Sequence, residues 1–458
     1  MKMLLVFVFS IFFSIVVAIE QIHLSLGTDE TEMIVTWTIP EQQTPLPHQQ
    51  ARVHYGSNNS SGQLQSVKAE VEHFDDDEAE YCTYRALLKE LKPNTTYYYW
   101  IEQEKRKSNL YHFKSLPSGN KWLPRFAIYG DLGYVNEQSL PYLKKDVEQN
   151  MYDVIFHVGD FAYDLPSENG WCGHNFMRSI EPVASRVPYM TCPGNHEEYN
   201  NFSHYDSRFT MLGDRTMPMH NSSLNDRINN HFHSMDIGPA HIIMFSTEYY
   251  YYTEYGWNQI RTQFEWLEKD LIQANKNRAK HPWIIVMGHR SLYCLKMGDD
   301  SCDHQTMERP EIRQGIHMHR RYNFPREYGL ENLFYKYGVD IQFYGHEHFY
   351  ARLAPIYNYT VLSGKRSTNP YDHPQGPIHI TTGSAGNLEL HPPFNHLKSW
   401  VSCHFLDYGY TRLLFENEYH IRLQQVSDDQ HGEVLDEIDI IKSAPQPQWM
   451  PQKKKIVS

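Results

Sequence analysis

The stretch "VIFHVGDFAY" (residues 154–163) decides the fold, because its apolar run ends abruptly in Gly159, Asp160 and, one short turn later, Tyr163. The run "FAIYGDLG" (126–133) repeats this pattern and places Asp131 directly after a glycine. A short apolar run bounded by a turn indicates a buried strand. Two such strands ending in a glycine–aspartate turn indicate a site rather than two unrelated loops.

Three further phrases follow apolar runs in the same way. They contain Asn195 and His196 in "GNHE", His289 in "VMGH", and His346 and His348 in "GHEH". Ligand sites in open α/β sheets lie at the carboxyl ends of the strands, so one crevice can collect the side chains of all five phrases. A single glycine–aspartate pair carries little information, but five such phrases in this order predict a shared site.

The strand and helix patterns divide the chain. From Gln21 to about Leu116, short alternating strands separated by turns predict an all-β sandwich. Further on, apolar strands alternate with amphipathic helical stretches, which predicts an α/β domain (an α+β sandwich) whose helices flank a mixed β-sheet core. From about Tyr408 to Ile441 we expect antiparallel edge strands. The predicted boundaries are 1–18 for a signal peptide, 19–118 for the sandwich, 119–442 for the α/β domain with a β-rich part from about 375, and 443–458 for a flexible tail.

The bulk composition restricts the partners and the compartment. The chain has 458 residues and a formal charge of −13, which disfavours nucleic-acid binding because that binding depends on basic surface. The apolar N-terminus with Lys2 predicts a cleaved secretory signal peptide, and its short length disfavours the alternative of a membrane anchor. The polar ending "PQKKKIVS" excludes a GPI tail. Secretion agrees with six N-glycosylation sequons, at Asn58, Asn59, Asn94, Asn201, Asn221 and Asn358. Extracellular and lysosomal residence both stay open.

The six cysteines are expected to pair at least partly in an oxidising compartment. Cys294 and Cys302 are close enough in sequence to close a local loop, and they are the one pair that we predict.

The donor types of the five phrases predict two different metal ions. Asp131, Asp160 and Tyr163 supply hard anionic oxygens that suit a trivalent iron. Neutral donors that suit a divalent ion sharing Asp160 come from Asn195, His289 and His346. His348 completes the iron side if "GHEH" is a strand, in which the two histidines would point to one face.

These phrases, in this order, resemble the purple acid phosphatases of the calcineurin-like metallophosphoesterase superfamily. The resemblance covers the whole mature chain, because larger members carry a fibronectin III-like N-terminal domain. The sequence "LKPNTTYYYW" (91–100) resembles the strand-entry signature of such domains. Gly133 stands where many non-purple relatives have a histidine, which favours the purple branch. The resemblance implies Fe(III) on Asp131, Asp160, Tyr163 and His348. It implies Zn, Mn or Fe(II) on Asp160, Asn195, His289 and His346.

The resemblance also gives His196 a catalytic part, as a phosphate contact that can protonate the leaving oxygen; the alternative is a histidine that only orients the site. The histidine pair by which plant members contact substrate is missing. Arg290 and His304 are candidates to replace it, and the alternative, which we favour, is that each is an ordinary surface or structural residue. Four other histidines in strand-like or loop segments are expected to be packed or solvated, namely His157, His231, His233 and His241. Glu197 and Glu347 are expected to be acids that support the metal ligands or are structural.

The predicted reaction is hydrolysis of phosphate monoesters at acidic pH, with metals that bind the phosphate and acidify a water molecule. Small-molecule esters and phosphoproteins are the expected substrates, no nucleic acid and no stable membrane anchor are expected, and a homodimer is left open. One alternative is a secreted metallophosphodiesterase or nucleotide phosphatase on the same fold. The other is a secreted binding module with a vestigial catalytic domain.

Overall fold

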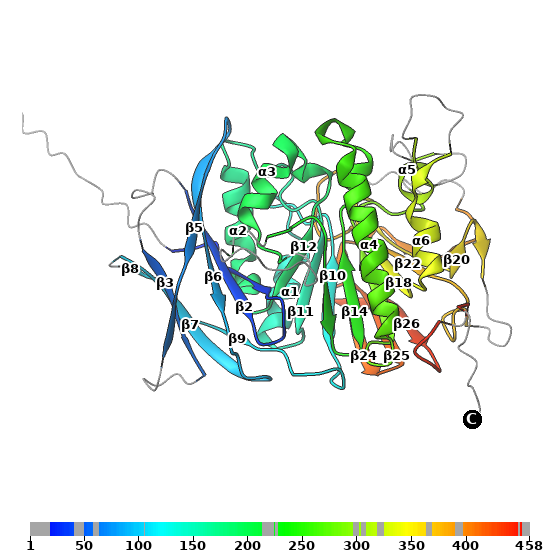
Figure 1. The fold of residues 1–458 in the computed structure, drawn as a ribbon, viewed down its shortest axis with the longest axis horizontal. Helices are drawn as coiled ribbons and strands as arrows, with labels where there is room; N and C mark the ends of the chain where they lie inside the picture. Colours follow the sequence, from blue (N-terminus) through cyan, green and yellow to red (C-terminus); the bar gives the residue numbers. More distant parts are fainter. Residues whose placement is uncertain are drawn as a thin grey trace, which may run out of the picture.

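A computed structural model gives the structure of the protein. It describes residues 19–40, 50–57, 64–104, 106–212, 224, 228–295, 302–303, 308–317, 325–362, 369–389, 397–447 and 449–450. The predicted signal peptide, the sequons at Asn58, Asn59 and Asn221, and His304 lie outside these residues. The strands drawn in blue form an N-terminal domain (residues 19–116) at one end of the long axis, and a C-terminal domain follows from Trp122 (Figure 1).

The N-terminal domain consists of two antiparallel sheets, as predicted for the sandwich. The first sheet has the order β1 (His23–Leu26), β2 (Met33–Pro40), β6 (Glu80–Leu88), β5 (Glu70–Asp75). The second has the order β4 (Gln65–Lys68), β3 (Ala51–Gly56), β7 (Thr96–Gln103), β8 (Arg106–Lys107), with β9 (Tyr111–Lys114) also on β7.

Two larger mixed sheets make up most of the C-terminal domain. The six-stranded sheet has the order β12 (Tyr189–Cys192), β11 (Val154–Val158), β10 (Arg125–Tyr129), β24 (Gly409–Asn417), β25 (His420–Ser427), β26 (Glu433–Ile441). The seven-stranded sheet has the order β13 (His233–Ile237), β14 (Ala240–Met244), β15 (Trp283–Met287), β18 (Ile341–Tyr344), β22 (Ile378–Thr382), β19 (Tyr350–Leu353), β23 (Val401–Phe405). Thr411 on β24 donates a hydrogen bond to Thr382 on β22, so the two sheets touch.

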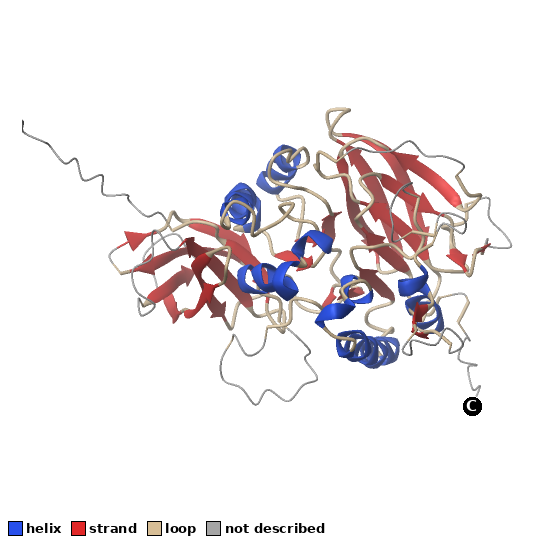
Figure 2. Cartoon of the chain, turned by 90° about the horizontal axis from the view of Figure 1, so that it is seen from above, coloured by secondary structure: helices blue, strands red, loops and turns tan. Residues whose placement is uncertain are grey.

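All α-helices of the described residues follow residue 139, and Figure 2 shows no helix within the N-terminal sandwich. They are α1 (Leu140–Glu148), α2 (Trp171–Ala184), α3 (Tyr199–Arg208), α4 (Asn258–Lys276), α5 (Pro310–Arg313) and α6 (Leu330–Lys336). Two short strand pairs, β16 (Gly315–Ile316) with β17 (Glu327–Tyr328) and β20 (Ile356–Tyr357) with β21 (Thr360–Val361), complete the fold.

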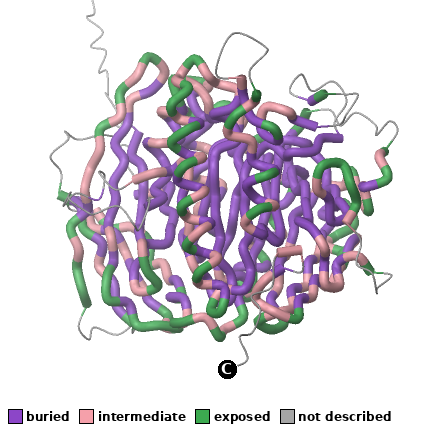
Figure 3. The backbone as a smooth tube through the Cα atoms, turned by 45° about the vertical axis from the view of Figure 1, so that its right-hand side comes forward, coloured by how far each residue is buried: buried purple, intermediate pink, exposed green. Residues whose placement is uncertain are grey.

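The apolar runs of the sequence form the centre of these sheets. Every residue of β11, β14, β15 and β22 is buried, and buried segments fill the middle of the molecule in Figure 3. Strands covered on both faces are selected for continuous apolar sequence, which explains why "VIFHV" does not alternate. The strand β10 runs parallel to β11, and β11 runs parallel to β12. In the other sheet, β15, β18 and β22 are parallel neighbours. The carboxyl ends of each set therefore lie at one edge.

The predicted fold class is confirmed, with one correction in the C-terminal strands. We expected edge strands after Tyr408, but β24 pairs directly with β10 inside the six-stranded sheet, and only β26 lies at the edge. The alternation of a strand shows which of its faces is buried and not which strand it pairs with.

The two domains share a buried interface. The Arg85 side chain of β6 is fully buried and donates hydrogen bonds to the Ser207 carbonyl (2.7 Å) and to Thr210 Oγ1 (3.0 Å) of the C-terminal domain. Tyr99 donates its hydroxyl proton to the Ser185 carbonyl at 2.7 Å. Core residues of both domains, such as Trp37 and Phe126, belong to one continuous apolar cluster.

The end of the chain also makes contacts. The Pro445 carbonyl accepts a hydrogen bond from Arg278 at 3.4 Å, and the Trp449 indole donates one to the Tyr335 carbonyl at 3.3 Å. These residues lie in the segment that we predicted to be a flexible tail. No helix within the described ranges is both long and apolar enough to cross a bilayer.

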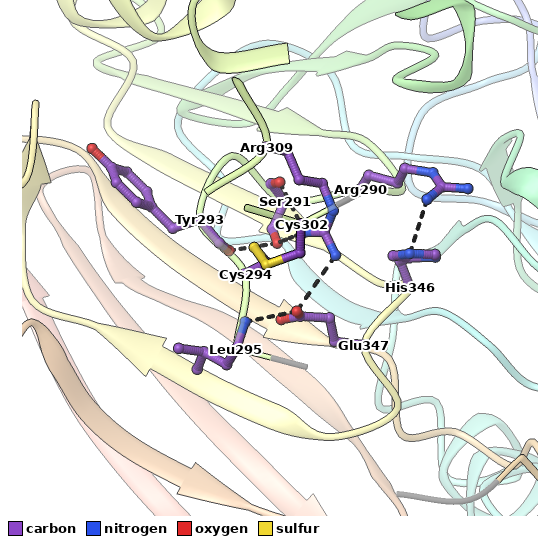
Figure 4. Close-up of a disulfide and its surroundings, with 9 residues drawn as sticks. All are labelled: Arg290, Ser291, Tyr293, Cys294, Leu295, Cys302, Arg309, His346 and Glu347. Carbon is purple, nitrogen blue, oxygen red and sulfur yellow. Dashed lines mark hydrogen bonds and ion pairs between the residues drawn. A yellow bond between two sulfur atoms is a disulfide. The ribbon is translucent and has the colours of Figure 1, made fainter. Parts of the chain in front are cut away.

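A disulfide joins Cys294 to Cys302, as predicted from their spacing. Next to it, the carboxylate of Glu347 accepts a hydrogen bond from the Leu295 amide at 2.7 Å and lies 3.4 Å from an Arg309 nitrogen (Figure 4). The cysteines at 82, 172, 192 and 403 are unpaired, so the expectation of at least partial pairing is met by one bridge among the described residues.

The buried imidazole of His241 predicts a pH-dependent stability. Its two ring nitrogens lie 2.6 Å from Asp236 and 2.9 Å from Asp270. Burial lowers the pKa of His241, but the two carboxylates outweigh burial and raise it to about 9. Because the folded pKa exceeds the unfolded value, this stabilisation is complete below about pH 6.5 and is lost as the pH rises through about 9.

We expect the free energy of unfolding to fall, between these pH values, by on the order of 3 kcal/mol more in the wild type than in His241→Gln. Urea unfolding at a series of pH values measures this difference. Parallel pH profiles for the two proteins would contradict the prediction.

Candidate metal centre and active site

The five predicted phrases lie in loops that leave the carboxyl ends of parallel strands. Asp131 follows β10, Asp160 and Tyr163 follow β11, and the segment Asn195–Glu197 follows β12. In the other sheet, His289 follows β15, and the two histidines of "GHEH" follow β18. Hydrogen bonds from the Asp131 amide to the Gly159 carbonyl (3.1 Å) and from the Gly345 amide to the His289 carbonyl (2.8 Å) hold neighbouring loops together.

The backbone of these loops is unusual. Four of the seven predicted metal ligands have positive φ although they are not glycine, namely Asp131 (61°), Asp160 (55°), Tyr163 (57°) and His346 (68°). Such conformations cost free energy and cluster at functional sites, because surrounding contacts hold them in place. At Gly159, with φ of 88°, a Cβ atom would lie 2.6 Å from His289 Nδ1, so only glycine allows this close approach.

One side of the site contains oxygen donors and a histidine. The Tyr163 hydroxyl lies 3.3 Å from Asp131 Oδ1 and 3.1 Å from His348 Nε2. His348 Nε2 is 3.4 Å from the same Asp131 oxygen. The two carboxylates and His348 are buried. Asp131, Asp160 and His348 each offer a ligand atom within 4.8 Å of the others, which is a spacing that can hold one ion.

The other side is built around His289. Its Nε2 atom lies 3.2 Å from Asp160 Oδ2 and 3.1 Å from Asn195 Oδ1. Its Nδ1 atom donates to the Val158 carbonyl at 2.8 Å, so in the neutral imidazole the Nε2 lone pair is free to bind a metal. Asp160, His289 and His346 form a second group whose ligand atoms lie within 4.8 Å of one another.

The two groups share Asp160, so the structure brings the predicted ligands together at one centre. The route to His346 and His348 differs from our expectation. We predicted that strand alternation points both to one face, but β18 ends at Tyr344 and the histidines lie in the loop before β19. His346 is in the left-handed region, and its amide donates to Asp131 Oδ2 at 2.9 Å. The loop thereby turns one histidine toward each half of the site.

Comparisons with known proteins agree with this geometry. Residues 124–350 match the family described as "Calcineurin-like phosphoesterase", residues 19–115 match "Purple acid Phosphatase, N-terminal domain", and residues 376–437 match "Iron/zinc purple acid phosphatase-like protein C". The chain is 44% identical over 427 residues to "Acid phosphatase type 7" of Homo sapiens, covering 92% of this chain and 91% of the relative.

The chain belongs to the purple acid phosphatase family. The Danio rerio "Acid phosphatase type 7" is 42% identical over 430 residues, with 92% of this chain and 91% of the relative covered. The solved structure of purple acid phosphatase PPD1 from yellow lupin seeds superimposes with a TM-score of 0.71 at 26% identity, covering 93% of this chain and 74% of the other. The predicted family and enzyme class are confirmed: the protein is an acid phosphatase. The alternative of a binding module without catalysis is therefore wrong.

The family implies a binuclear metal centre, and the electrostatics of this phosphatase fit one. Burial, together with the Asp131 and Asp160 carboxylates, raises the pKa of Tyr163 well above its usual range. Burial opposes ionisation of Asp160 as well, but His289 and His196 outweigh it and lower the pKa of this carboxyl. Burial would lower the pKa of His289, yet Asp160 raises it to about 10. In this arrangement the neighbouring carboxylates keep protons on Tyr163 and His289. A multivalent cation that binds the same donor groups would displace those protons.

Two further residues of the phosphatase, Glu197 and Asn387, support the donors. Glu197 is buried and its carboxylate accepts hydrogen bonds from the amides of Asp160 (2.8 Å), Phe161 (3.0 Å) and Gly194 (2.8 Å). We predicted a supporting or structural acid there, and it fixes two of the five loops. The Asn387 amide lies 2.9 Å from His348 Nε2. Our sequence analysis did not single out Asn387, although it ends the segment "GSAGN" (383–387) that directly follows β22.

Arg290, a candidate substrate contact, lies 3.0 Å from His346 Nε2 and 2.9 Å from a Glu248 carboxylate oxygen. It therefore contacts a predicted ligand directly. The histidines that we expected to be packed belong to neither donor group. His157 and His233 are buried, His231 pairs with Asp206, and His241 lies between two aspartates.

Proposed function

We propose that this acid phosphatase hydrolyses phosphate monoesters at a binuclear Fe(III)–M(II) centre, with zinc, manganese or iron as the divalent ion. The observation that carries the proposal is the sharing of Asp160 by two buried donor groups of different charge. The iron would be held by Asp131, Asp160, Tyr163 and His348. The divalent ion would be held by Asp160, Asn195, His289 and His346. When bound, such a pair neutralises phosphate charge and makes water acidic enough to act as a nucleophile near or below neutral pH.

The protein's own contribution next to this centre is His196. Its amide donates to Asp160 Oδ1 at 3.0 Å, which fixes the backbone, and its Nδ1 lies 2.9 Å from Asp164 Oδ1. Burial lowers the pKa of His196, but Asp160 and Asp164 outweigh burial and raise it to about 9. The imidazole therefore holds a proton at Nε2, where it can stabilise the phosphate and then protonate the leaving oxygen.

Replacing His196 by alanine is expected to lower kcat on phenyl phosphate esters by about 100-fold, which is the usual contribution of a positioned general acid. The loss should be smaller for esters of more acidic alcohols, whose leaving group needs no proton. Steady-state kinetics over a series of leaving groups measures both effects. The half-exposed His73 on β5 provides the control His73→Ala, which should behave as wild type. Unchanged turnover in His196→Ala would mean that this histidine only orients the site.

The alternative of a phosphodiesterase or nucleotide phosphatase shares the same donors and differs in the groups around the substrate. We expect kcat/KM for p-nitrophenyl phosphate to exceed that for its bis ester. The assay should accompany metal analysis of the purified protein, which we expect to contain iron and a divalent ion. A faster reaction with the bis ester, or equal activity in protein stripped of metal, would contradict the proposal.

We further propose that the chain is secreted and glycosylated, with extracellular or lysosomal residence, and that phosphoproteins as well as small esters are substrates. The sequons at Asn94, Asn201 and Asn358 support this proposal, because Asn94 and Asn358 lie in surface turns and Asn201 is exposed on α3. A homodimer is left open.

A further inference from the structure

A hollow of about 350 Å³ opens directly beside the proposed reacting groups. Asn195 and His196 form one of its walls, and the remaining lining includes the carboxylates of Glu78, Asp164 and Glu198. Because His196 faces the leaving oxygen in the proposed reaction, the alcohol part of the ester has to enter this hollow.

A second, shallower hollow of about 530 Å³ continues from the first, since Glu198 and Tyr199 line both. Asp76 and Asp77 line its far side, together with the ring of Tyr255. The Tyr255 hydroxyl donates to the Glu198 carboxylate at 2.8 Å, which fixes the position of that charge.

The far wall comes from the N-terminal domain. Asp76, Asp77 and Glu78 lie in the turn between β5 and β6, and Asp76 Oδ1 accepts hydrogen bonds from the amides of Glu78 and Ala79, both at 2.9 Å. The other Asp76 oxygen lies 3.0 Å from His204 Nε2 on α3. The acidic turn therefore contacts the C-terminal domain beside the site.

The charge of this surface is mostly negative, and the imidazolium proposed for His196 is the one cation among the described lining residues. Of the described residues that line the two hollows, five are carboxylates and none is a lysine or arginine. Such a surface repels a second phosphate or carboxylate on the leaving group and attracts a cation. The rings of Tyr199 and Tyr255 add faces on which an ammonium group can stack.

We propose that the two hollows are a leaving-group subsite that selects phosphate monoesters whose alcohol carries a positive charge. The inference rests on the proposed phosphomonoesterase function and adds the substrate class to it. The shared chemistry is an ammonium or guanidinium group near the ester, supplied either by an amino alcohol or by basic residues next to a phosphoserine. A cationic group of either source can reach the first hollow from the ester, but only a peptide is long enough to reach the second.

The test compares substrates matched in shape. Phosphocholine is paired with 3,3-dimethylbutyl phosphate, its uncharged isostere, and a Lys-phosphoserine-Lys peptide is paired with Gln-phosphoserine-Gln. At low salt we expect the charged member to have the higher kcat/KM, mainly through a lower KM, by about 10-fold for several exposed charges acting together. Raising the salt concentration should weaken this preference.

The variants Glu78→Gln and Glu198→Gln keep the side-chain shape and remove one charge each. Each is expected to reduce the preference for the charged substrate, measured as the ratio of kcat/KM within each pair, by about three-fold. Asp77→Asn should affect only the peptide pair. The matched control is Glu416→Gln, an exposed glutamate near the end of β24 and beside the start of β10, at the opposite end of these strands from the site.

The outcomes separate the two levels of the proposal. No hydrolysis of p-nitrophenyl phosphate by the metal-loaded wild type would overturn the proposed function itself. Normal hydrolysis of that ester with equal kcat/KM within both pairs, or a preference that Glu78→Gln and Glu198→Gln leave unchanged, would overturn the subsite alone. A preference in both pairs supports a subsite for amino alcohols and peptides, and a preference in the peptide pair alone supports basic phosphopeptides.

Discussion

Asp160→Asn is expected to lower kcat/KM on p-nitrophenyl phosphate by at least about 1000-fold, equivalent to about 4 kcal/mol of transition-state stabilisation. The reason is the position of this carboxylate in both donor groups, so its replacement by a neutral amide weakens two metal positions at once. The metal content is expected to fall to roughly half of the wild-type value or below, because binding at a bridging position depends on the ligand's charge.

Metal analysis of the purified variant separates this effect from misfolding. Asparagine keeps the shape of the side chain and can still accept the His196 amide through its carbonyl oxygen, so circular dichroism should match wild type. Asp439→Asn, on the exposed edge strand β26, is the matched control and should keep both activity and metal. An Asp160→Asn protein with wild-type turnover and metal content would refute the shared-ligand assignment.

Tyr163→Phe is expected to abolish the visible absorption band of the iron-loaded protein, since that band requires charge transfer from a phenolate to Fe(III). It should also lower kcat/KM by at least about 10- to 100-fold, the range seen when a metal's surroundings are weakened. The hydroxyl lies 3.3 Å from Asp131 and 3.1 Å from His348, so its removal leaves a gap beside these two donors without changing the packing of the ring.

An absorption spectrum of variant and wild type at equal iron content gives the answer directly. Tyr142→Phe removes a hydroxyl that donates to the Asp428 carbonyl and belongs to neither donor group, so this variant should keep the colour. A coloured Tyr163→Phe protein would show that another group binds the iron.

The central part of the site could be predicted from sequence because each parallel strand has two features that can be recognised there. Its buried body is a continuous apolar run, and its carboxyl end is where ligands lie. Asp131, Asp160 and His289 were found by this rule alone, and their neighbours in the two donor groups are 29 or more residues away in sequence, as with the contact from His289 to Asp160.

Other features had no comparable signal. The positive φ of His346 depends on contacts from Asp131, a residue of a different sheet, so local sequence predicted a strand where a turn forms. The support that Glu197 gives to three amides, and the approach of Asp164 to His196, are contacts between loops that no local pattern encodes. The pairing of β24 with β10 is likewise a long-range choice.

The buried contacts of Arg85 with Ser207 and Thr210 have a consequence for how the protein is built. Removing residues 19–116 would remove the fully buried Arg85 guanidinium and leave the Ser207 carbonyl and the Thr210 hydroxyl without this donor. It would also expose to water the apolar layer between the two domains. We therefore expect that the N-terminal domain cannot be removed from the folded protein. The two domains should unfold in a single transition, and the C-terminal domain should be insoluble when expressed alone.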